Sequence, residues 1–577
     1  MNIAFWEHSK NSVRINPYKL KKVLMSEGFG QFLSDKDRTS KKILLLKDKN
    51  TLKIYDPKTI KKFIGELLDG IDEKEFNNGG TLETPAPNKD SVPKYEVLCH
   101  WSRYHHSKLT SEVLDDLPVL SEHKDLEGTE YLKLFTDDQH TSFIRFKNGV
   151  VKITKDNIEL LDPSDKSIQG NVWESSIIPK DITVRESCGS FTRYVEKAML
   201  VRDREISEDD WTKEYPKTKD TKESLLSLRT ALGYLIHSHN TADQMKAIFF
   251  IDKGSDLGKP EGGNGKTRIL NSLKYFKKLS FQDGKRFRQD LDHGGRFQFA
   301  DVSFDTKLIL IDDLRPDFKF ESLFSMITGD MEVEGKGTNK FTIPEERKPK
   351  FAITTNYVLM GTGTSVSRRM HIVEFGDYWN RVILEKESPS DKKHLGKLLF
   401  DDNFNQDDWD DFYNFGFRCV QDYFKHGLVQ ADTSNYFLKA LRLKVEGVDG
   451  DGTVTGWMND WILTRNEEIF DIDLYDLFIA ENPMESLSWD SKRFSNQFFK
   501  FVMEHPDYDY NAHLSHKGDS KTQRRQQLGK RDQQQPHIVV TVKGVTPKVK
   551  GKSKTSNGST DTLDVENHEH YFKRLAS

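Results

Sequence analysis

Cysteine is scarce in this chain of 577 residues, and the three that occur, Cys99, Cys188 and Cys419, lie far apart. They form no Cys-x-x-Cys pair, which argues against a disulfide-stapled scaffold and against a cysteine-rich zinc site. Long apolar runs are also missing, and the first residues lack the apolar core of a secretion signal. We therefore expect a cytoplasmic protein with no membrane partner.

An excess of positive charge is likewise absent, because 87 lysines and arginines face 91 aspartates and glutamates and leave a net charge of −4. A surface that binds nucleic acid must therefore be local. Residues 517–554 form one basic stretch, in which eleven lysines and arginines stand against Asp519 and Asp532. The chain is too long for one hydrophobic core, so several domains are expected.

Several segments have the periodicity of a defined secondary structure. Residues 41–56 predict a hairpin, and residues 142–162 predict short strands with a turn at Asn148-Gly149. Helices are predicted over 409–426 and 491–505, and alternating strands and helices up to about Phe375 indicate an α/β sheet covered by helices. A further helix is predicted by apolar residues at helical spacing, namely Leu225, Leu228, Leu232, Leu235 and Ile236.

A glycine-rich loop lies between a predicted strand, KAIFFID, and a predicted helix, RILNSLKYFKKL. In this context the sequence EGGNGKT predicts a phosphate-binding loop, whose backbone N–H groups surround phosphate oxygens at a helix N-terminus. Lys266 is expected to reach the β- and γ-phosphates of ATP, and the Thr267 hydroxyl to bind Mg²⁺. The residues expected to form the loop are Gly262, Gly263, Asn264 and Gly265.

One position departs from the strict phosphate-loop pattern, because Pro260 stands where a glycine is expected. The three glycines that follow would supply the backbone freedom instead. The alternative interpretation is an ordinary glycine loop before a helix.

A second apolar run, TKLILIDDL, ends in paired carboxylates. Asp312 is expected to hold Mg²⁺, directly or through water, and Asp313 to act as general base on the attacking water. Taken alone, such a pair is more often a simple strand end. Its position after the phosphate loop favours the catalytic interpretation.

Two further polar signals follow. Asn356 ends the predicted strand KFAITTN, where it would contact the attacking water or the γ-phosphate; a strand-end turn is the alternative. Arg368 and Arg369 precede the strand MHIVEF, and one of them would act as an arginine finger in a neighbouring subunit's site. We favour Arg368, and a solvated or phosphate-binding pair is the alternative.

Taken in order, EGGNGKT, LILIDD, ITGDMEVEGKGTNKFTI, KFAITTN and SRR resemble the motifs of superfamily 3 helicases. The resemblance covers about residues 220–380 and is greatest to the C-terminal helicase part of phage, plasmid and large-DNA-virus primase-helicases. It implies an AAA+-like ATPase core, a homo-hexameric ring and translocation on single-stranded or forked DNA, typically 3′ to 5′. It also implies ATP and Mg²⁺ as cofactors, the host cytoplasm as location, and a separate primase or polymerase as a possible partner.

The same resemblance implies a hairpin within Gly329–Ile343 that projects into the ring channel, where Lys336 and Lys340 would grip DNA phosphates. A solvated turn is the alternative. Residues Asp283-Gly284-Lys285 also resemble a segment that recurs among phage relatives, but the sequence suggests no physical role for them.

The fold class expected is α/β, with an AAA+-like P-loop ATPase core and flanking accessory regions. Five regions are predicted: an α+β N-terminal region at 1–170, a helical collar at 171–242, the ATPase core at 243–385, a helical region at 386–486, and a tail at 487–577. The tail is either a winged-helix-like DNA-binding module or a helical cap followed by a disordered basic segment.

Other candidate sites are weak. Asp35 and Asp37 have the spacing of a primase metal pair but lie in a polar stretch, and Asp471 and Asp473 are better explained as helix-capping residues. The cluster Cys99, His100, His105 and His106 lacks the spacing of common zinc sites. The function predicted is therefore an ATP-dependent replicative helicase. The alternative is a P-loop ATPase that acts as an initiator, assembly or defence factor without unwinding.

Overall fold

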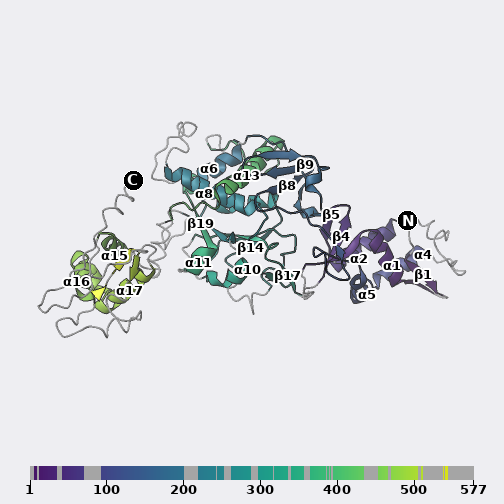
Figure 1. Ribbon diagram of the computed structural model, residues 1–577, viewed down its shortest axis with the longest axis horizontal. Helices are drawn as coiled ribbons and strands as arrows, with labels where there is room; N and C mark the ends of the chain where they lie inside the picture. Colours follow the sequence, from purple (N-terminus) through teal and green to yellow (C-terminus); the bar gives the residue numbers. More distant parts are fainter. Residues whose placement is uncertain are drawn as a thin grey trace.

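The computed structural model describes most of the chain, in three bodies that follow one another from the N-terminus to the C-terminus (Figure 1). Within it, no helix is both long enough and apolar enough to cross a bilayer. The described residues are 5–9, 12–34, 42–70, 93–104, 106–186, 188–200, 219–241, 244–252, 262–287, 297–315, 318–335, 340–356, 364–384, 386–388, 390, 394–433, 453–464, 469–504, 508–510, 537–538 and 540–542.

The N-terminal body is a six-stranded mixed sheet in the order β11-β5-β4-β3-β6-β7, with helices on one face. Its core on that face includes Phe29, Ile60, Ile64 and Trp101, all buried. The strands are β3 (Phe29–Leu33), β4 (Ile43–Asp48), β5 (Thr51–Ile54), β6 (Val119–Ser121), β7 (Glu130–Tyr131) and β11 (Val172–Trp173). The helices are α1 (Pro17–Ser26), α2 (Pro57–Asp69), α4 (Pro93–Ser102) and α5 (His106–Glu112), and a small hairpin joins β1 (Trp6–Ser9) to β2 (Ser12–Ile15).

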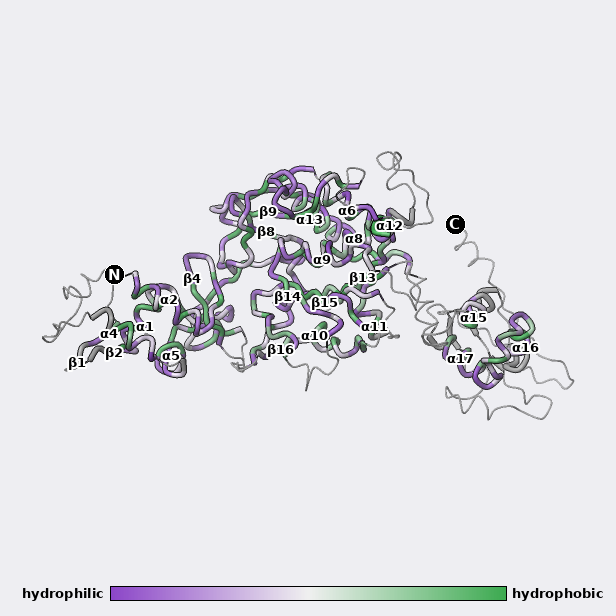
Figure 2. Tube along the Cα trace, turned by 180° about the vertical axis from the view of Figure 1, so that it is seen from behind, coloured by the Kyte–Doolittle hydropathy of each residue, from purple (hydrophilic) through white to green (hydrophobic). Residues whose placement is uncertain are grey.

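The central body is built on a five-stranded parallel sheet in the order β14-β15-β18-β13-β19. Four of the strands are largely apolar (Figure 2) and buried, as a parallel sheet covered on both faces requires, whereas the edge strand β14 is partly exposed. The five strands are β13 (Ala247–Asp252), β14 (Leu279–Asp283), β15 (Leu308–Asp312), β18 (Lys350–Thr354) and β19 (Met370–Phe375).

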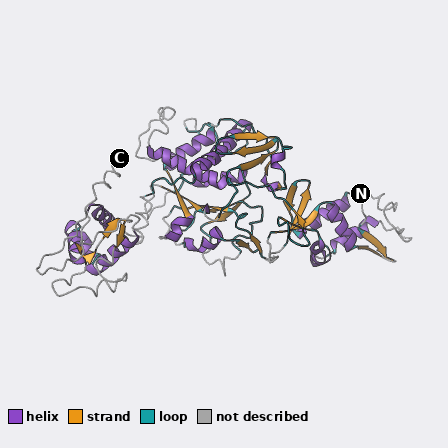
Figure 3. Ribbon diagram, viewed as in Figure 1, coloured by secondary structure: helices purple, strands orange, loops and turns teal. Residues whose placement is uncertain are grey.

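Helices pack on one face of this sheet, and a second sheet packs on those helices (Figure 3). Ile248, Phe250 and Leu310 point to this face because side chains alternate along a strand. The helices are α6 (Ser190–Ala198), α8 (Lys219–Ile236), α9 (Lys266–Asn271), α12 (Tyr378–Leu384) and α13 (Gln406–His426). The second sheet, in the order β10-β9-β8-β12, consists of β8 (Ser142–Phe146), β9 (Gly149–Ile153), β10 (Ile158–Leu161) and β12 (Ile177–Ile178).

The opposite face of the central sheet carries Phe249, Ile309 and Ile353. Short helices and a hairpin cover it: α10 (Phe324–Thr328), α11 (Thr364–Arg369), and β16 (Met331–Val333) paired with β17 (Phe341–Ile343). The N-terminal sheet joins the same core, because Phe32 packs against Phe304 at 5.0 Å between ring centroids.

The C-terminal body is a small helical unit with short strands. Its core is aromatic, with Phe478 stacked on Phe494 at 4.9 Å. It consists of α15 (Thr453–Thr464), β20 (Ile469–Phe470), α16 (Asp471–Glu481), α17 (Ser491–Glu504), β21 (Tyr508–Tyr510), β22 (His537–Ile538) and β23 (Val540–Val542). Strand β22 pairs with β20 and β23 with β21. This pairing is compatible with a wing; the winged-helix-like module stays a prediction, and the basic stretch at 517–554 lies outside the described residues except for 537–538 and 540–542.

Most of the elements expected from sequence patterns are present. The hairpin at 41–56 corresponds to β4 and β5, the strands at 142–162 to β8–β10, and the helix with the apolar leucine face to α8. The expected helix after the phosphate loop is shorter, because α9 ends at Asn271 and a 3-10 turn follows over Ser272–Tyr275. The Ser272 hydroxyl donates back to the Ile269 carbonyl at 2.6 Å, a side-chain contact that competes with a regular helix.

The parts of the chain that pack together differ from the five regions expected from the sequence. Strand β11 at 172–173 lies in the N-terminal sheet, beyond the boundary expected at 170. Helix α13 packs lengthwise on α8, so two segments predicted as separate regions form one helical layer. The fold class is α/β, as expected.

Candidate active site

The glycine-rich loop turns directly into helix α9 at the carboxyl end of β13. Gly263 has a φ of +100° and Gly265 a φ of +90°, a conformation that favours glycine. A Cβ on Gly265 would lie 2.7 Å from the Tyr194 hydroxyl, so the loop also packs closely against α6. The Asn380 side-chain amide donates to the Gly262 carbonyl at 2.6 Å and fixes the loop from the side of α12.

Lys266 is the buried cation of this site, with a side chain only 7% exposed. Its Nζ atom forms an ion pair with Asp252 and donates to Asn356 Oδ1 at 2.8 Å. Burial lowers the pKa of Lys266, and the carboxylates of Asp252, Asp313 and Asp312 oppose that shift. Lysine and asparagine, which are 90 residues apart in sequence, therefore meet at one edge of the sheet.

Thr267 and Asp312 meet at the same edge. The Thr267 hydroxyl donates to Asp312 Oδ1 at 2.7 Å, and the Thr354 hydroxyl donates to the same oxygen at 2.7 Å. A hydroxyl and a carboxylate oxygen in contact are the hard ligands that Mg²⁺ prefers. These two residues therefore fit the Mg²⁺ site that the sequence predicts.

Asp313 has a left-handed backbone, with a φ of +58°. Its backbone N–H donates to the Thr354 hydroxyl at 2.8 Å, which helps to hold this uncommon conformation. Its side chain is 34% exposed and contacts the Lys285 ammonium at 2.7 Å. The carboxylate is thus partly open to water beside the two residues expected to bind Mg²⁺, an exposure that suits a general base.

The Asp283-Gly284-Lys285 segment has a clear place in this geometry. The Gly284 N–H donates to the Asp312 carbonyl at 2.7 Å, and a Cβ on Gly284 would lie 2.5 Å from that oxygen. Lys285 contacts Asp313 from the same turn. The segment therefore positions both carboxylates, one through the backbone and one through an ion pair.

Replacing Gly284 with alanine is expected to displace the backbone of Asp312 and Leu314, because the new Cβ would lie within 2.7 Å of both. We expect unfolding to require about 1–3 kcal/mol less, and ATP turnover to fall about 100-fold through misplacement of the carboxylates. Chemical unfolding and phosphate release measure the two effects. Gly456→Ala is the matched control, because no atom lies within 4 Å of its Cβ; equal behaviour of the two variants would contradict the positioning role.

The structure distinguishes the two arginines at the end of α11. The Arg369 Nε atom donates to the Thr328 hydroxyl at 3.3 Å, and its guanidinium lies 4.6 Å from the centre of the Phe324 ring. Arg368 is exposed. Arg369 is thus held within its own chain, while Arg368 is exposed; the choice of Arg368 as the finger stays a prediction.

The expected hairpin is present as β16 and β17, with Met331 opposite Ile343 and Val333 opposite Phe341. Lys340 precedes β17 and forms an ion pair with Glu332 on the partner strand. Lys336 lies outside the described residues, so the structure describes only Lys340 of the two lysines expected to contact DNA.

Four residues of the site escaped prediction from the sequence. Asp252 carried a weak signal, as the carboxylate that ends the strand before the loop. Lys285 lay in the segment that resembles phage relatives, but no role was predicted for it. Thr354 and Asn380 had no signal of their own, since their roles depend on which strands and helices are neighbours in space.

The weaker candidates gain no support as sites. Asp35, Asp37 and His105 lie outside the described residues, and helix α16 begins at Asp471 itself. The His100 Nδ1 atom accepts from the Ile15 N–H at 3.0 Å. In the part of the chain that the structure describes, no group of three or more histidines, cysteines or carboxylates is arranged to hold a metal ion.

Residues 259–369 match the model of DUF5906, a family of unknown function. No curated protein matches the chain. Among solved structures, the chain is similar to an apo structure of the NrS-1 C-terminal region, with 12% identity, coverage of 77% of this chain and 79% of that chain, and a TM-score of 0.36. A second apo structure of that region gives 12% identity, coverage of 86% and 89%, and a TM-score of 0.32. Likeness at these values indicates no function, so the role of the site follows from its own residues.

Proposed function

We propose that this chain is an ATP-dependent DNA helicase of superfamily 3 that acts in the replication of a phage, a virus or another mobile element. The observation that carries the proposal is the convergence of Lys266, Thr267, Asp312, Asp313 and Asn356 at the carboxyl edge of one parallel sheet. Ligands of open α/β sheets bind at this edge.

Each residue has a task in ATP hydrolysis. Lys266 exchanges its contact with Asp252 for the β- and γ-phosphates, and Asn356, already in contact with Lys266, lies beside the γ-phosphate. Thr267 and Asp312 hold Mg²⁺, which neutralises charge on the phosphate oxygens. Asp313 takes a proton from water while the water oxygen bonds to the γ-phosphorus and the bond to the bridging oxygen breaks.

The proposal also includes assembly into a ring and contact with single-stranded DNA. An exposed Arg368 at the end of α11 suits a finger that enters the site of a neighbouring subunit in a homo-hexamer. The hairpin β16–β17 with Lys336 and Lys340 suits contact with the phosphates of single-stranded DNA. Translocation from 3′ to 5′ is the polarity that the resemblance implies.

Changing both Lys336 and Lys340 to alanine is expected to abolish the stimulation of ATP turnover by DNA and to leave the DNA-independent rate. The salt dependence of binding to single strands should also weaken, by about 0.7 in the logarithmic slope for each lysine that contacts a phosphate. Lys62→Ala, which removes an exposed lysine from the N-terminal helix α2, is the control. Full stimulation by DNA in the double variant would contradict this account of coupling.

Strand displacement on a forked duplex tests the helicase assignment itself. The expected result is ATP-dependent unwinding from a 3′ single-stranded tail. ATP hydrolysis without unwinding on any fork would instead assign the chain to the alternative function, a P-loop ATPase that acts as an initiator, assembly or defence factor.

A further inference from the structure

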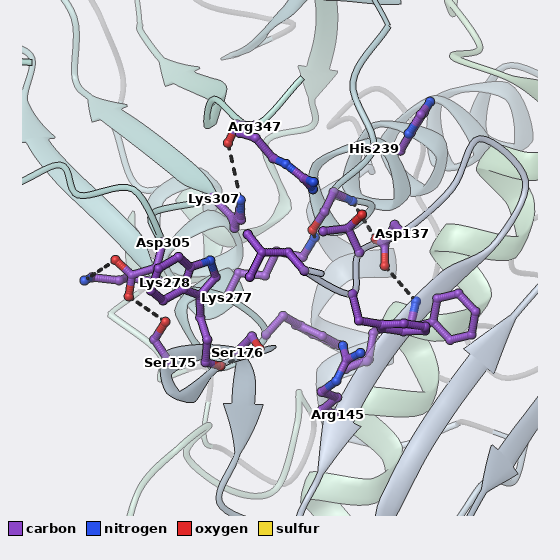
Figure 4. Close-up of a pocket in the computed structure, with 18 of the residues that line it drawn as sticks. Asp137, Arg145, Ser175, Ser176, His239, Lys277, Lys278, Asp305, Lys307 and Arg347 are labelled. Carbon is purple, nitrogen blue, oxygen red and sulfur yellow. Dashed lines mark hydrogen bonds and ion pairs between the residues drawn. The ribbon is translucent and has the colours of Figure 1, made fainter. Parts of the chain in front are cut away.

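A second cavity, of about 360 Å³, lies at the edge of the central sheet opposite the glycine-rich loop. Its core residues, which include Lys277 and Lys307, immediately precede the parallel strands β14 and β15, so they lie at the amino ends of those strands. The N-terminal sheet contributes Trp173, and the four-stranded sheet contributes Arg145 (Figure 4). The cavity is therefore formed where three parts of the fold meet.

Three cations face this cavity without an ion-pair partner among the described residues: Arg145, Lys277 and Lys307. The Lys277 ammonium donates to the Ser238 hydroxyl at 2.5 Å, and the Lys307 ammonium donates to the Arg347 carbonyl at 3.3 Å. The Arg145 Nη2 atom is buried and has no hydrogen-bond partner. The two lysine ammonium groups thus contact a hydroxyl and a carbonyl oxygen rather than a carboxylate.

The nearby carboxylates are engaged or lie at the rim. Asp305 pairs with Lys278 at 2.8 Å and accepts from the Ser175 hydroxyl at 2.7 Å. Asp137, the other buried carboxylate of the cavity wall, accepts from the N–H groups of Phe143 and Ser238 at 2.9 and 2.7 Å. The interior therefore carries more positive than negative charge.

The charged forms of these cations are costly without a ligand. Burial lowers the pKa of Lys277 to about 8 and that of Lys307 to about 8, and it lowers the pKa of Arg145 to about 10. An anion in the cavity would offset this desolvation by direct charge-assisted hydrogen bonds. The wall also contains Phe135, Phe143, Trp173 and Phe276. The Arg145 guanidinium already lies 4.5 Å from the centre of the Phe135 ring, and the other aromatic rings suit contact with an organic ring.

We propose that this cavity binds a nucleotide through its phosphate, with Arg145, Lys277 and Lys307 as the phosphate ligands and the aromatic wall beside the base or sugar. The volume suits one nucleotide unit. The same chemistry is offered by a free nucleotide and by the terminal phosphate of a DNA strand. The site is separate from the glycine-rich loop and does not depend on the proposed helicase function.

Titration calorimetry of the full chain with deoxyadenosine monophosphate in the absence of Mg²⁺ tests the site. Lys307→Met and Arg145→Gln are expected to weaken binding about 10- to 100-fold, the effect of losing a hydrogen bond to a charged group. Lys307→Met should also raise the melting temperature of the ligand-free protein, because it removes a partly buried charge without an ion-pair partner among the described residues. Lys266→Ala, which removes the expected phosphate contact of the glycine-rich loop, should leave this binding within twofold.

Full binding in Lys307→Met and Arg145→Gln would overturn the proposal, and loss of binding in Lys266→Ala would then assign the ligand to the glycine-rich loop. Absence of binding by the wild-type chain to both the monophosphate and a 5′-phosphorylated oligonucleotide would also overturn it. Tighter binding of the phosphorylated oligonucleotide than of its 5′-hydroxyl form supports the site with a strand end as ligand. Tighter binding of the monophosphate supports it with a free nucleotide. ATP hydrolysis measured on the same wild-type sample tests the helicase site separately.

Discussion

Arg368→Ala is expected to slow ATP turnover by about 10³- to 10⁵-fold while nucleotide binding is retained, because an arginine finger acts mainly on transition-state charge. Arg368 is exposed at the end of α11, so its removal should leave the fold of the subunit intact. Steady-state phosphate release, together with binding of a fluorescent ATP analogue, measures the two quantities separately.

Arg369→Ala is the matched control for this prediction. Arg369 contacts Thr328 and Phe324, so its loss should lower the free energy of unfolding by about 1 kcal/mol and reduce turnover much less. Mixing Arg368→Ala subunits with Asp313→Asn subunits should restore part of the activity, since some interfaces then combine an intact finger with an intact base. A larger loss in Arg369→Ala, or no recovery on mixing, would contradict a finger at Arg368.

Asp313→Asn is expected to lower kcat by about 10²- to 10⁴-fold, the usual contribution of a general base. Asparagine has nearly the same shape, and the backbone bond from residue 313 to Thr354 does not depend on the side chain. The ion pair with Lys285 is exposed on the lysine side, so little stability should be lost. KM for ATP should stay near its wild-type value, because the phosphate contacts of Lys266 are unchanged.

Asp283→Asn is the matched control, since Asp283 ends the neighbouring strand β14 and pairs with Arg286. It removes one carboxylate from the same edge of the sheet without removing the expected base. Full turnover in Asp313→Asn together with reduced turnover in Asp283→Asn would assign the general base to Asp283 on the neighbouring strand β14.

The residues of the candidate site were easier to select from the sequence than the contacts between them. Lys266, Thr267 and Asp312 could be found because each follows an apolar strand or a glycine loop, a local signal. The contact between Lys266 and Asn356 could not, because it depends on β18 lying directly beside β13. Long-range strand order is fixed by packing of the whole sheet, which local periodicity does not encode.

The same limit explains what was missed outside the site. The role of Gly284 follows from its close approach to the backbone of Asp312, which no spacing rule reveals. The cavity around Arg145, Lys277 and Lys307 draws on segments more than 100 residues apart. By contrast, the hairpin β4–β5 and helix α8 were predicted well, because their turns and apolar faces are determined by residues that are close together in the sequence.

Phosphate release from ATP by the purified full-length chain, with and without Mg²⁺ and single-stranded DNA, tests the central claim most directly. The arrangement of Lys266, Thr267, Asp312 and Asp313 predicts turnover that requires Mg²⁺, rises with DNA and falls about 10²- to 10⁴-fold in Asp313→Asn. Wild-type phosphate release no higher than that of Asp313→Asn, under every one of these conditions, would contradict an ATP-hydrolysing site at this edge of the sheet.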